Sequence, residues 1–159
     1  MKILSIAVPC YNSQEYMSHA IESILVGGED VEIIIVNDGS SDDTSKIAHE
    51  YEEKYPTIIK AVDKENGGHG DAVNSGLTHA TGKYFKVVDS DDWVDAEALR
   101  KILEFLKKLE SEDEEVDMLI SNYVYEKVGA THKKCIHYRN VLPQNKIFKW
   151  EEIGRFHLD

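Results

Sequence analysis

The sequence of 159 residues has little cysteine and proline and no long hydrophobic run. Its two cysteines, Cys10 and Cys135, match neither the spacing of a metal site nor a disulfide framework, which indicates a reduced, cytoplasmic protein. The apolar run Ile3–Val8 is interrupted by Ser5 and ended by Pro9, so it is too short for a signal peptide or a membrane span. No other window approaches the roughly 18 apolar residues of a transmembrane helix.

Basic residues are scarce relative to acidic ones: 18 lysines and arginines stand against 30 aspartates and glutamates, for a formal net charge of −12. An acidic chain repels nucleic acid backbones and anionic membrane surfaces, so nucleic acid is not expected as a partner. If the chain binds a phosphate, that charge must be neutralised locally, by a cation or by backbone N–H groups. The hydrophobic share of 42% excludes a disordered chain and predicts a folded core.

Short β-branched runs alternate with segments of helical spacing over residues 3–109. The runs are Ile3–Val8, Val31–Val36, Thr57–Val62 and Tyr84–Val88. Each is nearly continuous in apolar character, as strands buried on both faces are. Strands that alternate with helices through short loops form βαβ units with right-handed crossovers. The pattern therefore predicts an α/β fold with a mostly parallel sheet flanked by helices.

The helix ends are predicted from capping residues. Ser13, Asp42 or Asp43, and Asp95 are expected at N-termini, and Gly27-Gly28 at a C-terminus. In the last of these helices, Leu99, Leu103 and Leu106 share one apolar face.

The character of the sequence changes after Leu109. The acidic run 110–115 is typical of a solvated loop, and Asp117–Val124 is expected to form a further strand. The basic and aromatic stretch Lys127–Lys149 is either an exposed hairpin with ordinary surface charge or a face for a lipid-linked or anionic acceptor. We expect one region over residues 1–110 and a second over 111–159.

Polar, acidic or glycine-rich segments follow all four predicted strands. They begin at Pro9, Asn37, Asp63 and Asp89. Each can be explained by turn chemistry alone, because Asn, Asp, Gly and Ser favour turns. Parallel α/β sheets bind ligands at the carboxyl ends of their strands, and all four segments lie at that edge. The sequence therefore predicts a ligand site there.

The acidic pair Asp89 and Asp91 directly follows an apolar strand. In an extended segment residues i and i+2 point the same way, so both carboxylates can converge on one site. Two such groups repel each other unless a cation lies between them. A divalent ion with substrate phosphates satisfies this requirement, because Mg²⁺ sites use one or two carboxylates. The alternative is that Asp89 only begins a turn.

Three other residues have two interpretations each. Asp38 is either a turn residue or an acceptor for a donor group on a nucleobase. Tyr11 is either a core aromatic or a stacking surface for a base, and His69 is either a phosphate donor or a loop histidine. The segment Gly67–Gly70 departs from the dinucleotide-binding fingerprint, since Val73 stands where the third glycine belongs.

Together these segments resemble the family 2 glycosyltransferases over residues 3–95. The matching segments are Val8–Asn12, Val36–Thr44, Asn66–Leu77 and Gly82–Asp92. The resemblance implies a GT-A (Rossmann-like) fold and transfer of a sugar from a nucleoside-diphosphate sugar, UDP being the expected nucleotide, with inversion. We also expect a saccharide or lipid-linked acceptor, and a cytoplasmic location that can be peripheral to the inner face of the membrane.

The resemblance also implies residue roles. The expected donor-binding residues are Pro9, Tyr11, Asn12, Asp38, Asn66, Gly67, Gly68, His69, Asp89 and Ser90. Asp38 would hold the nucleobase together with the loop at Pro9–Tyr11, and Asp89 would face the ribose or the sugar. Asp91, with Asp89, would ligate Mn²⁺ or Mg²⁺ that bridges the diphosphate.

Two departures from the family pattern leave an alternative open. Val73 stands where the family usually has an arginine, so diphosphate contacts would fall to the metal, His69 or backbone N–H groups. No acidic residue after Asp92 is identified as the general base that an inverting transfer needs. We therefore expect residues 1–110 to bind the nucleotide sugar and residues 111–159 to begin a truncated acceptor-side region. The alternative is a non-catalytic nucleotide-sugar-binding domain.

Overall fold

The computed structural model describes residues 2–126 and 133–153. The chain forms two compact units, Met1–Asp113 and Glu114–Asp159, which are described separately below. The last helix of the first unit ends at Ser111.

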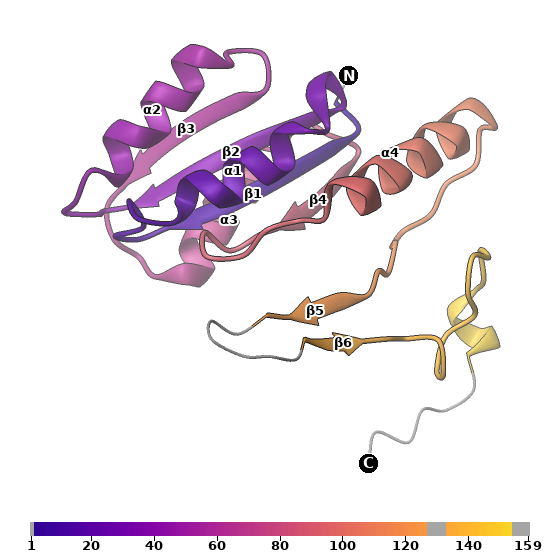
Figure 1. Ribbon diagram of the computed structural model, residues 1–159. Coiled ribbons are helices and arrows are strands. Elements are labelled where there is room, and N and C mark those ends of the chain that lie inside the picture. Colours follow the sequence, from indigo (N-terminus) through magenta and orange to yellow (C-terminus); the bar gives the residue numbers. More distant parts are fainter. Residues whose placement is uncertain (1, 127–132, 154–159) are drawn as a thin grey trace. The chain divides into compact units, whose positions relative to one another are not determined.

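The first unit is built on a four-stranded parallel sheet in the order β3-β2-β1-β4 (Figure 1). The strands are β1 (Leu4–Cys10), β2 (Val31–Asp38), β3 (Ile59–Lys64) and β4 (Tyr84–Val87). Strands β1 and β2 are buried almost throughout, whereas β3 and β4, at the edges, are only partly buried. The predicted α/β fold with a parallel sheet is confirmed.

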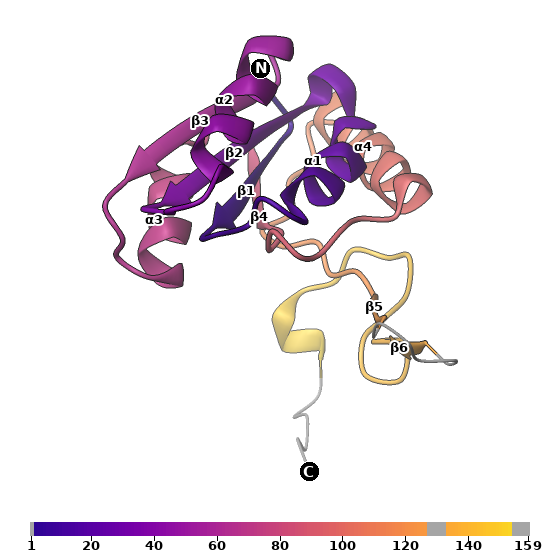
Figure 2. The same ribbon diagram turned by 60° about the vertical axis from the view of Figure 1, so that its left-hand side comes forward.

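Helices connect the strands and cover both faces of the sheet. They are α1 (Met17–Leu25), α2 (Thr44–Lys54), α3 (His69–His79) and α4 (Ala96–Ser111), with a short 3-10 helix at Gly28–Asp30. Because crossovers are right-handed, α1 and α2, which step along the sheet in one direction, lie opposite α3, which steps back. Figure 2 shows α3 on the side of the sheet away from α1 and α4.

Helix α3 packs tightly on the two central strands. A Cβ atom at Gly76 would lie 2.5 Å from the Cβ of Ala7, so only glycine permits this approach of the helix to β1. The close packing brings the N-terminal end of α3 to the carboxyl edge of the sheet.

Several predicted boundaries are wrong. Strands β1, β2 and β3 each continue two residues further than predicted, to Cys10, Asp38 and Lys64. The third strand begins at Ile59 rather than Thr57, because a turn comes first and the N–H groups of Ile58 and Ile59 donate to the carbonyl of Tyr55. His69 and Gly70, predicted in a loop, form the first turn of α3.

The predicted caps have different outcomes. Asp95 caps α4 by accepting a hydrogen bond from the Ala98 N–H at 2.8 Å, as predicted. Asp42 accepts from the N–H of Thr44, the first residue of α2. The prediction for Ser13 is wrong, since α1 starts at Met17 and the Ser13 hydroxyl bonds instead to loop groups.

The described residues of the second unit form an antiparallel pair, β5 (Tyr123–Tyr125) and β6 (Lys134–Ile136), and a 3-10 helix at Trp150–Glu152. The predicted strand Asp117–Val124 is wrong over most of its length, because strand pairing begins only at Tyr123. Part of the basic stretch, residues 127–132, lies outside the described residues. Within the described ranges no helix has both the length and the apolar character that a membrane span requires.

Candidate functional site

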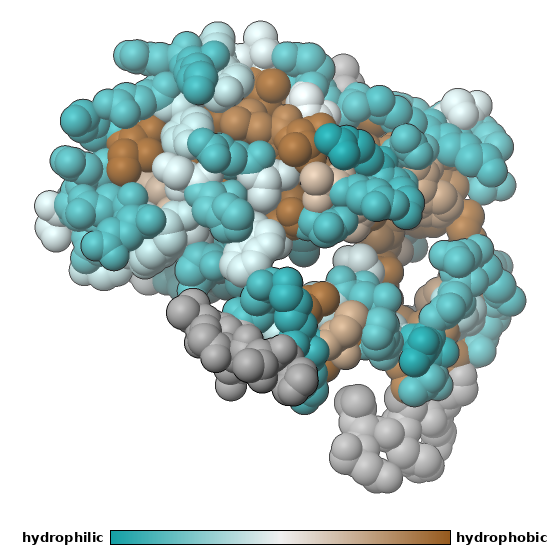
Figure 3. Space-filling model, viewed as in Figure 1, coloured by the Kyte–Doolittle hydropathy of each residue, from teal (hydrophilic) through white to brown (hydrophobic). Residues whose placement is uncertain are grey.

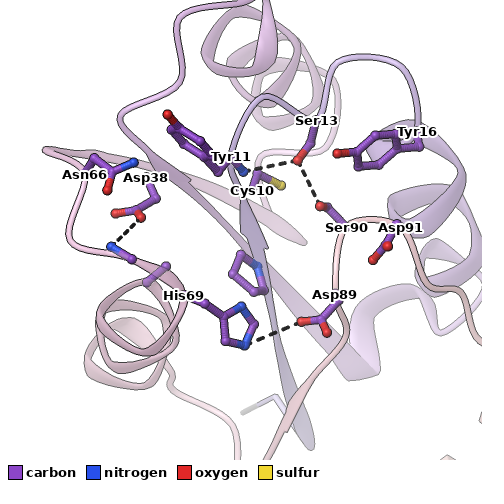
Figure 4. A pocket seen from close by; sticks show the side chains of 13 residues that line it. Cys10, Tyr11, Ser13, Tyr16, Asp38, Asn66, His69, Asp89, Ser90 and Asp91 are labelled. Atoms are coloured by element: carbon purple, nitrogen blue, oxygen red, sulfur yellow. Dashed lines mark hydrogen bonds and ion pairs between the residues drawn. The ribbon is translucent and has the colours of Figure 1, made fainter.

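A cavity of about 480 Å³ opens at the carboxyl edge of the sheet (Figure 4). All four strands send residues to it, from their last positions or from the segments that follow. The lining residues are Pro9, Cys10, Tyr11, Ser13, Tyr16, Asp38, Asn66, Gly68, His69, Ala72, Asp89, Ser90 and Asp91. Nine of these are predicted donor-site residues or metal ligands; of the predicted set, Asn12 and Gly67 do not line the cavity.

The loop after β1 is joined to the loop after β4 at the base of the cavity. The Ser13 hydroxyl accepts a hydrogen bond from the Tyr11 N–H at 3.1 Å and shares another with the Ser90 hydroxyl at 2.9 Å. Both serines are buried. Burial raises the pKa of the neighbouring Cys10 thiol to about 12, so this thiol stays protonated and is a packing group.

Asn12 links two loops and does not face the cavity. Its φ of 49° lies in the left-handed region, which asparagine tolerates. Its N–H donates to the Ser40 hydroxyl at 2.9 Å, and its side-chain oxygen accepts from the Ser41 N–H at 2.9 Å. Asn12 therefore holds the loop after β1 against the loop after β2.

Asp38, the last residue of β2, is buried, and its carboxylate organises the loop between β3 and α3. Oδ1 accepts from Lys64 Nζ at 2.6 Å and from the Gly67 N–H at 2.9 Å, while Oδ2 accepts from the Gly68 N–H at 2.8 Å. Burial raises the pKa of Asp38, but these three donors outweigh it and hold the pKa below its usual range. The carboxylate is therefore ionised at neutral pH.

The loop that Asp38 organises lies directly against the loop after β2. Gly39 has a φ of +67°, and a Cβ atom on it would lie 2.7 Å from the backbone N of Asn66. Gly68, with a φ of +86°, adopts the left-handed conformation just before α3. Glycines at both positions allow the backbone to approach the cavity closely.

The acidic segment after β4 forms a turn. The Asp92 N–H donates to the Asp89 carbonyl at 2.9 Å, so the extended geometry predicted for Asp89 and Asp91 is wrong. Both side chains nevertheless reach the cavity from this turn, as Figure 4 shows.

Asp89 has a polar atom that the surrounding protein leaves unpaired. Its Oδ1 is buried and has no hydrogen-bond partner among the described residues. Nε2 of His69, at the first position of α3, lies 3.7 Å from this oxygen. A buried carboxylate oxygen without a donor is suited to a cation or to a ligand hydroxyl.

The residues present fit a divalent cation whose coordination a ligand completes. Within the described ranges no three His, Cys, Asp or Glu side chains converge as a metal site. Two carboxylates, from Asp89 and Asp91, are the number that Mg²⁺ takes from protein when phosphates supply the other oxygens. Burial raises the pKa of nearby Asp92, and the charges of Asp91 and Asp89 raise it further. The segment thus concentrates negative charge that a cation would neutralise.

Several site residues were not predicted from the sequence. The unpredicted residues that line the cavity are Cys10, Ser13, Tyr16 and Ala72. Lys64 is not among the lining residues, but it donates a hydrogen bond to Asp38, which is. Cys10 and Ser13 flank the predicted Tyr11-Asn12 pair, and their position at the end of β1 and just after it could have indicated them. Tyr16 and Lys64 have no local pattern that marks them, because their roles depend on residues distant in the sequence.

The chain matches one family model and is similar to several bacterial proteins. The model of the family described as "Glycosyl transferase family 2" matches residues 5–149. Minor teichoic acid biosynthesis protein GgaB of Bacillus subtilis (strain 168) is 39% identical over 111 residues, which cover 68% of this chain and 12% of GgaB. The putative glycosyltransferase EpsH of the same strain is 32% identical over 167 residues, which cover 96% of this chain and 46% of EpsH.

Solved structures have the same fold. S. aureus TarS 1-349 in complex with UDP-GlcNAc superposes with a TM-score of 0.60 at 32% identity, covering 69% of this chain and 32% of that one. The mannosyltransferase PcManGT from Pyrobaculum calidifontis, in complex with GDP-Man and Mn²⁺, has a TM-score of 0.57 at 25% identity, covering 65% of this chain and 32% of that one.

The chain spans less than half the length of each of these four relatives. The family match, in contrast, includes every residue that lines the cavity. The resemblance noted in the four sequence segments is thereby confirmed, and the chain belongs to glycosyl transferase family 2.

Proposed function

We propose that this chain is the donor-binding part of a glycosyltransferase that takes its sugar from a UDP-sugar, with Mn²⁺ or Mg²⁺, and inverts the anomeric centre. The observation that carries the proposal is the cavity at the carboxyl edge of the sheet. It combines an ionised, buried Asp38 at one end with the acidic segment Asp89–Asp91 at the other.

The two ends of the cavity fit the two ends of a nucleotide sugar. The nucleobase would lie beside Asp38 and the ring of Tyr11, with Pro9 and the Asn66–Gly68 loop around it. The diphosphate would lie between His69 and Asp91, and Asp89 would face the ribose or the sugar. Gly67 and Asn12 would act by shaping the loops.

Asp91 and Asp89 would hold the cation, together with diphosphate oxygens. When bound, the cation supplies a Lewis acid that stabilises negative charge on the leaving diphosphate. His69 at the first position of α3 can donate a hydrogen bond to the same phosphates, which compensates in part for Val73. Ser90 holds this segment in place through its bond to Ser13.

Two relatives support the choice of nucleotide and metal. TarS is described in complex with UDP-GlcNAc, and PcManGT in complex with GDP-Man and Mn²⁺. We favour UDP because TarS has the higher sequence identity. The acceptor, saccharide or lipid-linked, and a cytoplasmic location peripheral to the membrane stay predictions.

Calorimetric titration of UDP with and without Mn²⁺ tests the proposal. We expect binding that Mn²⁺ strengthens, and Asp91→Asn should remove the Mn²⁺-dependent part, about tenfold or more in affinity, by deleting a charged ligand. Asp43→Asn is the matched control, since Asp43 is exposed and does not line the cavity. Absence of UDP binding by the folded wild-type chain would refute the donor site.

Turnover separates the transferase from a non-catalytic binding domain. UDP released from a UDP-sugar in the presence of saccharide or lipid-linked acceptors, with an inverted product by NMR, supports transfer. Tight donor binding without any release of UDP favours the binding domain, because a site without a general base cannot activate an acceptor hydroxyl.

A further inference from the structure

Lys64 is a half-buried cation that pairs with Asp38 at one end of the cavity, in a position that no sequence pattern marks. Its side chain, the last in β3, is only 18% exposed. Nζ lies 2.6 Å from Asp38 Oδ1 and 2.7 Å from Asp71 Oδ2, and it also donates to the carbonyl of Glu65.

These contacts connect three segments around one ammonium group. Asp38 ends β2, Glu65 begins the loop after β3, and Asp71 lies in the first turn of α3. The same Asp38 carboxylate accepts the Gly67 and Gly68 N–H groups. Lys64 therefore stabilises both the carboxylate and the loop that folds against it.

The hydrogen bonds of Asp38 leave it able to accept one more. A carboxylate has about four acceptor positions, and Asp38 uses two on Oδ1 and one on Oδ2 within the described part of the chain. Asp38 lines the cavity, so a ligand can reach the remaining position. An ionised carboxylate has no proton to donate, and its partner there must carry an N–H or O–H.

This requirement distinguishes nucleobases. Uracil presents a ring N–H at position 3, whereas cytosine presents a bare, accepting nitrogen at the same position. Cytosine has its N–H donors on the exocyclic amine at position 4, so the distinction applies to a carboxylate placed opposite position 3. There, a carboxylate that only accepts pairs with uracil and opposes the cytosine nitrogen.

We propose that Lys64 is a positioning residue for base selection: it keeps Asp38 a pure hydrogen-bond acceptor and holds the Asn66–Gly68 loop closed, so the site prefers uracil to cytosine. The inference rests on the proposed function, because it assumes a nucleotide in this cavity. Asp71, in α3, forms a second ion pair with Lys64. Its side chain is 56% exposed, whereas the side chain of Asp38 is 4% exposed.

Replacing Lys64 removes the only side-chain cation that contacts Asp38 in the described residues. In Lys64→Met the buried Asp38 keeps two backbone donors but no counter-charge, so its carboxyl takes up a proton more easily. A protonated carboxyl both donates and accepts, and it can then pair with cytosine as well as uracil.

The experiment measures UDP and CDP affinities by calorimetry with Mn²⁺ present, on the full chain. The two nucleotides have the same ribose and diphosphate, so the ratio of their affinities reports the base contact alone. This ratio is also independent of the folded fraction, since both titrations use one preparation. We expect wild type to favour UDP by about tenfold or more, and Lys64→Met to bring the ratio close to one.

Two further variants complete the test. Lys64→Arg retains the positive charge and should keep most of the preference for UDP. Lys60→Met makes the same substitution at an exposed position of the same strand, and it should leave the ratio unchanged.

The outcomes separate this inference from the function on which it rests. If wild type binds UDP and Lys64→Met keeps the wild-type ratio, Lys64 does not select the base. The inference is also overturned if Lys64→Arg loses the preference as fully as Lys64→Met, or if wild type binds UDP and CDP equally. If wild type binds neither nucleotide, the proposed donor site itself fails.

Discussion

The carboxylates of Asp38, Asp63 and Asp89 differ in their hydrogen-bond partners, and this difference suggests a different role for each. Asp38 is paired with one ammonium and two N–H groups. Asp63, one residue before Lys64, accepts from Asn37, Ser45 and His49. Asp89 alone of these three has a buried oxygen that no described residue satisfies. The paired groups shape the loops, and Asp89 is the carboxylate that we propose for the ligand or the metal.

His49 should make the stability of the first unit depend on pH. Its Nε2 lies 2.6 Å from Asp63 and its Nδ1 lies 3.2 Å from Glu52, so both ring nitrogens donate when the ring is protonated. The hydrogen bond to Asp63 raises the pKa of His49 above 6.5; burial opposes the rise and Glu52 adds to it. The stabilisation is therefore complete below about pH 6.5 and is lost as pH rises through the folded-state pKa.

Urea unfolding of wild type and His49→Gln between pH 6 and pH 9 measures this effect. We expect the variant to be less stable by about 0.5–1 kcal/mol at pH 6, the range of exposed ion pairs, and nearly equal to wild type at pH 9. A stability difference that stays constant across this range would mean that His49 acts through packing and not through charge.

At the scale of elements, α4 shows how a cap and an apolar stripe together define a helix. Its buried residues are Leu99, Leu103, Leu106 and Leu109. Figure 3 shows hydrophilic residues over its outward side. Asp95 accepts a hydrogen bond from the Ala98 N–H and marks the end of the acidic segment. The helix therefore anchors the segment that carries Asp89 and Asp91.

Asp95→Ala should destabilise the first unit by about 1 kcal/mol, because the Ala98 N–H loses its acceptor at the helix N-terminus. Asp95→Asn is the control, since its side-chain oxygen retains the acceptor, and it should lose distinctly less. Chemical denaturation measures both variants. Equal losses would show that the charge of Asp95, and not its capping hydrogen bond, stabilises α4.

At the scale of the whole molecule, the cavity belongs entirely to the first unit. Its lining residues lie between Pro9 and Asp91, and the unit ends at Asp113. It has its own core on β1 and β2. Nucleotide binding should therefore need only this unit.

A chain of residues 1–113 should bind UDP with Mn²⁺ within about twofold of the affinity of the 159-residue chain, because all cavity contacts are retained. Calorimetry on both chains measures this, and circular dichroism confirms that the shorter chain is folded. A folded 1–113 chain without UDP affinity would mean that residues 114–159 contribute to the donor site.

The sequence by itself determined the alternation of strands and helices, the order of the four polar segments and their place at one edge of the sheet. These features depend on local periodicity and on the rule that parallel strands end together. The four segments were enough to identify the family and most of the residues that line the cavity.

Only the tertiary structure decided which polar atoms pair. Lys64 meets Asp38 across 26 residues and Ser13 meets Ser90 across 77, while Asn12 turns from the cavity to the loop after β2. The buried oxygen of Asp89 likewise appears only once the strands are packed. Such pairings depend on strand register and on loop conformation, which side-chain periodicity does not encode.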